Sequence, residues 1–178
     1  MIQDYIKSFK DFPVDGIDYK DIASLCASVD GFKLANDFMY REAYEVGPSK
    51  VVGLDARGFP FAAILSDMLQ VPLILARKSG KLPGPVITQS YSLEYGTASI
   101  EIQSNVIDCL DEVVIVDDLI ATGGTMNATI DIIEGLGAKV AKVLCVIDLP
   151  YLNGSTIIKD RGIEIASATM YNKAGHYL

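Results

Sequence analysis

Cysteine, histidine and tryptophan are scarce in this sequence. Its 178 residues include three cysteines, one histidine and no tryptophan. Cys26, Cys109 and Cys145 form no closely spaced pair, so they predict unpaired thiols in a reducing compartment, by default the cytoplasm. His176 has no neighbours at metal-ligand spacing. We therefore expect neither a disulfide framework nor a metal site built from protein side chains.

Long apolar runs and an excess of basic residues are also missing. Met1–Asp11 lacks the apolar stretch of a signal peptide, and no later run could cross a bilayer, so no membrane partner is expected. The 15 basic residues face 23 acidic ones, which gives a net charge of −8. This balance disfavours nucleic acid as a partner, although a small phosphorylated ligand needs only a local basic pocket. The length predicts a single domain over residues 1–178.

What the sequence does contain is an alternation of buried strands and helices. Val113–Val116 is an unbroken β-branched run, typical of a strand buried on both faces. With a helix over 126–136, capped by Gly137, and a strand over 140–147, it predicts a βαβ unit. Further patterns predict helices over 30–46 and 59–69 and strands over 50–54 and 71–76. The predicted fold is α/β, with a mostly parallel twisted sheet flanked by helices.

Residues 77–97 do not follow this alternation. They carry several hydroxyls, a tyrosine-rich end and the turn-forming residues Gly80, Pro83, Gly84, Pro85 and Gly96. A loop of this length is uncommon inside a compact domain and is often functional, so we expect an excursion from the core here. The chain is expected to return as a strand over 99–107.

The strongest functional signal is the run Val113–Thr125, VVIVDDLIATGGT. Its strand leads into two carboxylates, Asp117 and Asp118, and ligands of open α/β sheets bind outside the carboxyl ends of strands. The small, hydroxyl-bearing stretch Ala121–Thr125 then opens a helix, whose N–H groups and dipole favour an anion. A phosphate beside a diol, as in ribose 5-phosphate, suits this arrangement. The alternative is a plain turn with a helix cap; neither a Walker A lysine nor a GxGxxG spacing is present.

The same run resembles the phosphoribosyl pyrophosphate motif of type I phosphoribosyltransferases. Four further segments are similar to the adenine phosphoribosyltransferase family: FPVDGIDYKDI (12–22), VVGLDARGF (51–59), RKSGKLPG (77–84) and SYSLEYG (90–96). The resemblance covers about residues 9–147 and is weak beyond them. It implies a type I fold with a small N-terminal hood over residues 1–30, which forms part of the base pocket. It also implies a flexible catalytic loop over 77–98 that acts as a lid.

The resemblance also implies the roles of individual residues. Asp117 and Asp118 would face the ribose hydroxyls and the positive charge that develops at the anomeric carbon. Glu94 would act as general acid/base near the purine, which makes these three the catalytic residues. The 5-phosphate would be wrapped by Ala121, Thr122, Gly123, Gly124 and Thr125.

The pyrophosphate would meet a loop and two basic residues. The loop consists of Asp55, Ala56 and Arg57, and a strained non-proline peptide is expected at Ala56–Arg57. Lys81 would close over the pyrophosphate, assisted by Arg77 from the same subunit or its neighbour. Ala56 replaces the serine that is common in the family, so one side-chain donor is expected to be missing.

The purine would meet the hood and the lid. Tyr19 would stack on the ring, beside Asp18, Lys20 and Tyr95. Asp18 and Lys20 depart from the apolar residue and the arginine that are usual in the family. We hypothesise that the Asp18 carboxylate accepts a hydrogen bond from the exocyclic amine of adenine and so reinforces selection of a 6-amino purine. The alternatives are that Asp18 points outward or pairs with Lys20.

The implied reaction is displacement of pyrophosphate by N9 of adenine, which gives AMP through an oxocarbenium-like transition state. Mg²⁺ is implied as cofactor, held mainly by substrate oxygens and water, and a homodimer as the assembly. One alternative is a transferase for hypoxanthine or guanine, against which the SYSLEYG segment argues. The other is a non-catalytic regulator that senses phosphoribosyl pyrophosphate, for which we expect a DNA-binding segment or a basic face.

Overall fold

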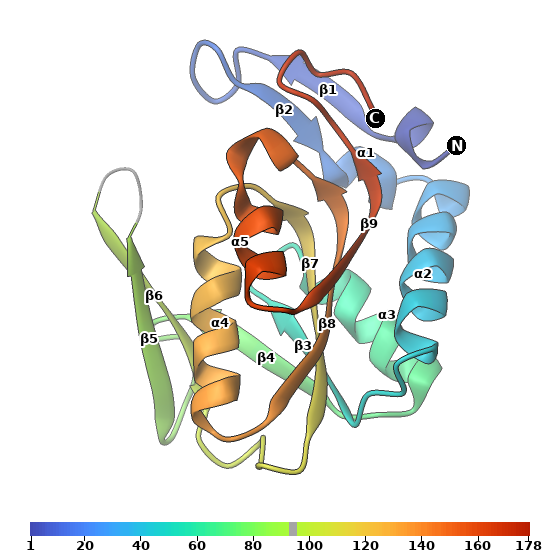
Figure 1. Ribbon diagram of the computed structural model, residues 1–178. Helices are drawn as coiled ribbons and strands as arrows, with labels where there is room; N and C mark the ends of the chain where they lie inside the picture. The colour runs from blue at the N-terminus through green and yellow to red at the C-terminus, as the bar shows by residue number, and fades with distance from the viewer. Residues whose placement is uncertain (93–95) are drawn as a thin grey trace.

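The chain forms a seven-stranded sheet with helices on both faces and a small hood at one end (Figure 1). The structure, a computed structural model, describes residues 1–92 and 96–178. The strands lie in the order β5-β6-β4-β3-β7-β8-β9. Their bounds are β3 Lys50–Leu54, β4 Leu73–Lys78, β5 Val86–Ser92, β6 Thr97–Gln103, β7 Glu112–Ile120, β8 Lys139–Asp148 and β9 Glu164–Met170.

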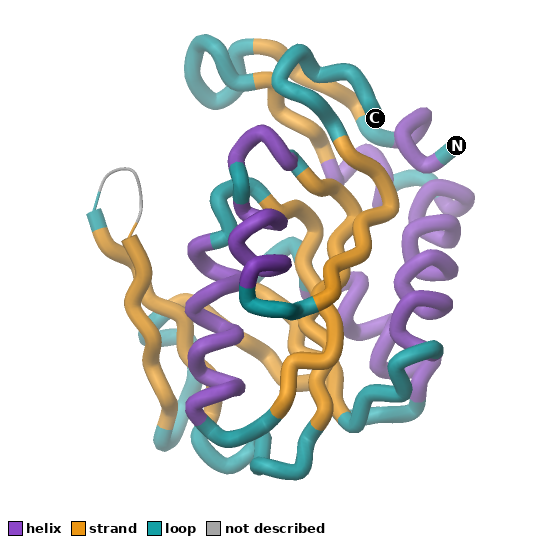
Figure 2. Tube along the Cα trace, viewed as in Figure 1, coloured by secondary structure: helices purple, strands orange, loops and turns teal. Residues whose placement is uncertain are grey.

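The sheet is parallel from β4 to β9 and antiparallel at the edge formed by β5 and β6. Helices α2 (Val29–Tyr44) and α3 (Phe59–Leu69) cover one face, and α4 (Gly124–Gly135) and α5 (Gly154–Asp160) cover the other (Figure 2). Each face has its own buried core. The central β7 contributes to both, because successive strand residues point to opposite faces. This arrangement confirms the predicted fold.

The hood lies above the sheet, where the two ends of the chain meet (Figure 1). It contains η1 (Ile2–Tyr5), β1 (Lys7–Lys10), β2 (Asp18–Asp21) and α1 (Ile22–Cys26); a second short helix, η2 (Pro150–Leu152), precedes α5. Strands β1 and β2 pair antiparallel. Asp21 caps α1, because its carboxylate accepts hydrogen bonds from the N–H groups of Ala23 and Ser24. The cap fixes the point at which the hood joins the core.

Several predicted elements are confirmed closely. Helix α3 and strand β3 have the predicted bounds. Strand β7 is longer than predicted and runs to Ile120, so Asp117 and Asp118 lie inside it; the strand continues because Ile120 still pairs with Asp148 of β8. The sequence analysis missed α5 and β9. None of the helices in the described residues combines the length and hydropathy that a membrane span requires.

The predicted excursion over residues 77–97 is wrong for most of the described part. Strand β4 continues to Lys78, and β5 and β6 form a hairpin that joins the sheet through β4. Polar side chains pair across this hairpin: Ser90 Oγ lies 2.9 Å from Ser99 Oγ, and the buried Glu101 carboxylate accepts a hydrogen bond from Thr88 Oγ1 at 3.4 Å. The same carboxylate accepts a hydrogen bond at 2.6 Å from Oγ of Ser79, which follows β4. The hydroxyls that indicated a loop are therefore partners within a sheet edge.

Candidate active site

A cleft of about 650 Å³ opens at the carboxyl ends of β3, β4 and β7. The predicted residues that line it are Asp55, Ala56, Arg57, Asp117, Asp118 and Ala121 to Thr125. Residues missed by the sequence analysis also line it: Lys78, Tyr91, Ala98, Leu119, Ile120 and Met126. This is the edge at which ligands of open α/β sheets bind.

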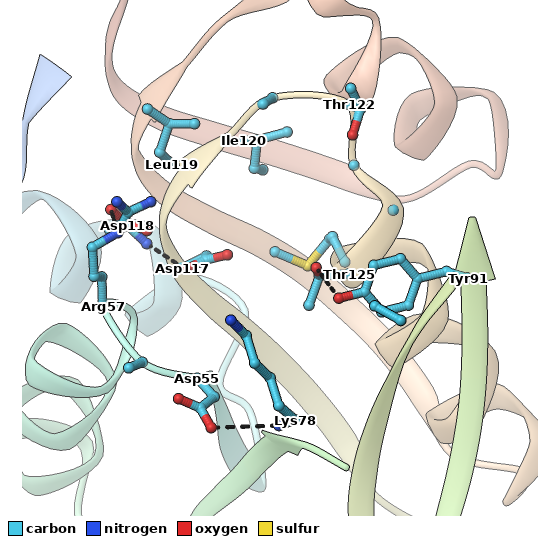
Figure 3. A pocket seen from close by; sticks show the side chains of 16 residues that line it. Asp55, Arg57, Lys78, Tyr91, Asp117, Asp118, Leu119, Ile120, Thr122 and Thr125 are labelled. Atoms are coloured by element: carbon cyan, nitrogen blue, oxygen red, sulfur yellow. Dashed lines mark hydrogen bonds and ion pairs between the residues drawn. The ribbon is translucent and has the colours of Figure 1, made fainter. Parts of the chain in front are cut away.

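The acid pair forms one side of the cleft (Figure 3). Asp118 is 3% exposed, and its Oδ2 lies 2.7 Å from Nε of Arg57 as an ion pair without hydrogen-bond alignment. Asp117 Oδ1 accepts a hydrogen bond from the N–H of Asp118 at 2.8 Å. Burial raises the pKa of both carboxyl groups; the charge of Asp118 adds to the rise at Asp117, and Arg57 opposes the rise at Asp118. A positive centre in the cleft would favour the charged form of both carboxyl groups and so lower both pKa values, with the larger effect at Asp117.

Arg57 links this acid pair to the hood. Its Nη1 donates a hydrogen bond to the hydroxyl of Tyr19 at 3.0 Å. Burial alone would lower the pKa of Arg57, but Asp118 and Tyr19 outweigh burial and raise it. Tyr19 is thereby held at the hood side of the cleft, although it is not among the residues that line the cleft.

The unusual peptide of this loop is displaced from its predicted position. We expected it at Ala56–Arg57, and the cis non-proline bond lies at Asp55–Ala56. The N–H of Asp55 still donates to the carbonyl of Ala76 in the neighbouring strand at 3.0 Å. Strand β3 ends at Leu54, yet Asp55 keeps this contact with β4.

The loop Ala121–Thr125 joins β7 to α4 on another side of the cleft. Gly123 has a φ of 78°, a left-handed conformation that favours glycine, and α4 begins at Gly124. The first N–H groups of a helix have no partner within it, so they are available to an anion. The hydroxyl of Tyr91 accepts a hydrogen bond from Thr125 Oγ1 at 2.9 Å (Figure 3), which ties the β5–β6 hairpin to this loop.

A lysine that the sequence analysis did not single out lines the cleft. The side chain of Lys78 extends into the cleft, between the acid pair and Thr125 (Figure 3). Arg77 and Lys81 do not line the cleft. Arg77 Nε lies 3.4 Å from Asp55 Oδ2, and Arg77 Nη1 donates a hydrogen bond to the carbonyl of Lys81 at 3.1 Å. Lys78 is the last residue of β4, and the predicted strand over 71–76 stopped two residues short of it. With the strand extended to residue 78, the rule that ligands bind at the carboxyl ends of parallel strands would have indicated Lys78.

Asp18 and Lys20 lie in the hood, away from the cleft. Lys20 is 5% exposed, and its Nζ donates hydrogen bonds to Ser8 Oγ at 2.8 Å, Asp18 Oδ2 at 2.9 Å and the Gly175 carbonyl at 3.1 Å. It also lies 4.4 Å from the ring centroid of Tyr171. The alternative in which Asp18 pairs with Lys20 is therefore confirmed. Lys20 fastens the hood to the C-terminal segment.

Three residues considered in the sequence analysis, Glu94, Tyr95 and His176, are not among the described residues that line the cleft. Glu94 and Tyr95 lie outside the described residues. His176 lies in the C-terminal segment, where its N–H donates a hydrogen bond to Asn172 Oδ1 at 3.1 Å. Across residues 1–92 and 96–178, no group of three or more histidine, cysteine, aspartate or glutamate side chains is placed to hold a metal ion.

Comparison with known proteins agrees with this geometry. A family model of the phosphoribosyl transferase domain matches residues 26–173. An adenine phosphoribosyltransferase from Marinomonas sp. (strain MWYL1) is 40% identical over 171 residues, which cover 96% of this chain and 95% of that protein. The chain belongs to the adenine phosphoribosyltransferase family.

Solved structures of the family share the fold of this chain. The structure of an adenine phosphoribosyltransferase from Thermoanaerobacter pseudethanolicus has a TM-score of 0.89 and 35% identity, with 96% of this chain and 98% of that chain covered. The enzyme from Saccharomyces cerevisiae was solved with D-2,5-dideoxy-2,5-imino-altritol 1,6-bisphosphate and adenine. It has a TM-score of 0.84 and 32% identity, with 93% and 95% covered.

Proposed function

We propose that this chain transfers the phosphoribosyl group of phosphoribosyl pyrophosphate to N9 of adenine, giving AMP and pyrophosphate. One observation carries the proposal: an acid pair, half-buried at Asp117 and buried at Asp118, and a glycine-rich loop at a helix start line the same cleft. A ribose 5-phosphate matches this arrangement, because its diol suits the carboxylates and its phosphate suits the loop. Family membership and the relatives' names support adenine as the base.

The phosphate end of the substrate is assigned to Ala121–Thr125. Backbone N–H groups at the start of α4 and the hydroxyls of Thr122 and Thr125 are suitable donors for the 5-phosphate. Thr125 must then exchange or share the hydrogen bond that it donates to Tyr91. The anchored phosphate would fix the ribose over the acid pair.

The acid pair is assigned to the ribose and its developing charge. As the bond from the anomeric carbon to pyrophosphate breaks, positive charge grows on the sugar, and carboxylates placed in advance stabilise that charge. Asp117 carries this role best, because Arg57 already faces Asp118. Arg57 and Lys78 would meet the departing pyrophosphate, and Arg77 and Lys81 remain proposed contacts from the adjoining segment.

Mg²⁺ fits this cleft. Burial raises the pKa of Asp117 and Asp118, and a hard cation nearby would favour their charged forms. We propose that the ion would be held mainly by substrate oxygens and water. When bound, it would neutralise charge on the pyrophosphate.

The base is assigned to the hood. Tyr19, held by Arg57, would stack on the purine. Glu94 and Tyr95 remain proposed from the family resemblance, Glu94 as the group that exchanges a proton with the purine and Tyr95 as a substrate contact. We also propose a single domain, a cytoplasmic location and a homodimer. The homodimer is proposed from the family resemblance.

A base panel tests the proposal. The protein is incubated with phosphoribosyl pyrophosphate and Mg²⁺ and offered adenine, hypoxanthine, guanine or xanthine, and each nucleotide is measured. We expect AMP from adenine, and no AMP once Mg²⁺ is chelated. IMP or GMP as the main product would favour the 6-oxopurine alternative. Binding of phosphoribosyl pyrophosphate without any nucleotide would favour the regulator.

A further inference from the structure

The loop Ala121–Thr125 has a rear side, which faces away from the cleft and packs against the start of α5. Gly154, the first residue of α5, donates a backbone hydrogen bond to the carbonyl of Ala121 at 3.0 Å. Gly154 does not line the cleft, yet it touches the loop to which the 5-phosphate is assigned.

A glycine is needed at position 154 because the backbone of the loop lies so close to it, and not because of its backbone conformation. It lies in a helix with a φ outside the left-handed region, so its backbone conformation suits any residue. A Cβ at this position would lie 2.3 Å from the Ala121 carbonyl oxygen, 2.7 Å from Gly123 N and 2.9 Å from the Thr122 carbonyl carbon. All three are backbone atoms, so no side-chain rotation can make room. A side chain at 154 therefore forces the loop and the start of α5 apart.

Asn127 holds the same loop from α4. Its Nδ2 donates to the carbonyl of Gly123 at 3.0 Å, and its backbone N–H donates to the same oxygen at 2.8 Å. Its Oδ1 accepts from Arg161 Nη1 at 3.3 Å. Arg161 is itself held by Asp131 at 2.8 Å and Glu134 at 2.6 Å. The carbonyl of Gly123 is therefore fixed, and with it the direction of the N–H groups that follow.

We propose that Gly154 and Asn127 are positioning residues for the 5-phosphate. The inference rests on the function proposed above, because it assumes that Ala121–Thr125 binds that phosphate. Several backbone N–H groups can share one phosphate only if each points at it, and displacements of about 1 Å are enough to lose much of the effect. The close contact at Gly154 and the bond from Asn127 set this geometry from the rear.

The test compares Gly154→Ala with Gly135→Ala. Gly135 is the last residue of α4; it has a φ outside the left-handed region and nothing within 4 Å of an added Cβ. Calorimetry with ribose 5-phosphate gives the dissociation constant, and steady-state kinetics give KM for each substrate. In Gly154→Ala we expect both the ribose 5-phosphate dissociation constant and KM for phosphoribosyl pyrophosphate to rise about tenfold or more. KM for adenine at saturating phosphoribosyl pyrophosphate should stay at the wild-type value, as should every value in Gly135→Ala.

A second pair of variants keeps the inference testable if Gly154→Ala does not fold. Asn127→Ala removes a side-chain bond to the carbonyl four residues earlier, and Asn36→Ala removes the same kind of bond in α2, where Asn36 Nδ2 donates to the Phe32 carbonyl at 2.8 Å. We expect ribose 5-phosphate to bind several-fold more weakly to Asn127→Ala and unchanged to Asn36→Ala.

The outcomes separate this inference from the proposed function. Wild-type affinity for ribose 5-phosphate in both Gly154→Ala and Asn127→Ala would overturn the inference alone. The inference would also be overturned if both variants weakened adenine binding as much as ribose 5-phosphate binding, because the damage would then be general. Wild-type protein that bound no ribose 5-phosphate would contradict the proposed function and this inference together.

Discussion

Replacing Asp117 by asparagine keeps the size of the side chain and removes one charge from the acid pair. Asp117 is the partner that Arg57 does not face, so its charge is the more available to the sugar. Loss of one transition-state contact of this kind typically costs about 3 kcal/mol. Because about 1.4 kcal/mol corresponds to a factor of ten in rate, kcat for AMP formation should fall roughly a hundredfold.

The same replacement should stabilise the free protein. Burial raises the pKa of Asp117, so the folded state binds its proton more tightly than the unfolded state does. The free energy of unfolding of the wild type therefore falls as the pH rises through the window between the ordinary and the raised pKa. Asparagine does not titrate. The advantage of Asp117→Asn should be absent at acid pH and largest above the raised pKa, where we expect about 0.5–2 kcal/mol.

Urea unfolding of the ligand-free protein at a series of pH values, together with kcat, checks both effects. Asp118→Asn is the matched control. Its kcat should fall by less than that of Asp117→Asn, because Arg57 already faces Asp118, and it should gain no stability, because Arg57 loses its carboxylate partner. Wild-type turnover in both variants would refute the role of the pair. A stability gain in Asp117→Asn that did not grow with pH would refute the assigned cause.

Three further predictions test the remaining assignments. Lys78→Met should raise KM for phosphoribosyl pyrophosphate about tenfold, and more than Lys81→Met does, because Lys78 alone of the two lines the cleft; the reverse order in steady-state kinetics would contradict the cleft geometry. Asp18→Val should leave the adenine-to-hypoxanthine ratio of kcat/KM unchanged and lower the free energy of unfolding by about 1–3 kcal/mol, because the buried Lys20 loses its carboxylate; a shifted ratio would revive the selection hypothesis. Glu94→Gln should lower kcat far more than it weakens substrate binding, and the opposite pattern would assign Glu94 to binding.

The central sheet could be predicted because its pattern is local. Short stretches of sequence are enough to predict the strand at Val113–Val116 and the helix at 59–69, and both are observed. The acid pair and the glycine-rich loop follow that run directly, so their meeting in one cleft needed only the rule for parallel sheets.

The edge hairpin could not be predicted in the same way. Val86–Ser92 alternates between partly buried and exposed residues, but glycines and prolines just before it dominated the local signal. Its polar side chains are satisfied across the strands, by partners such as Ser99 for Ser90, and pairing of this kind depends on a register that the sequence does not display.

Long-range contacts account for the other misses. The partners of buried Lys20 include the carbonyl of Gly175, which lies 155 residues further along the chain. Gly154 contacts the phosphate loop because the fold brings the start of α5 against it, and nothing in the segment after Ile147 indicated such a contact. Composition predicts that a lysine is exposed, and only the fold supplies the partners that bury it.

The stoichiometry of the products tests the central claim most directly. The protein is incubated with adenine, phosphoribosyl pyrophosphate and Mg²⁺, and AMP and pyrophosphate are measured in the same samples over time. Transfer through the cleft of Asp117 and Ala121–Thr125 predicts that the two products appear in equal amounts and that neither appears without adenine. Pyrophosphate released without AMP, or binding of phosphoribosyl pyrophosphate with no product at all, would contradict the account.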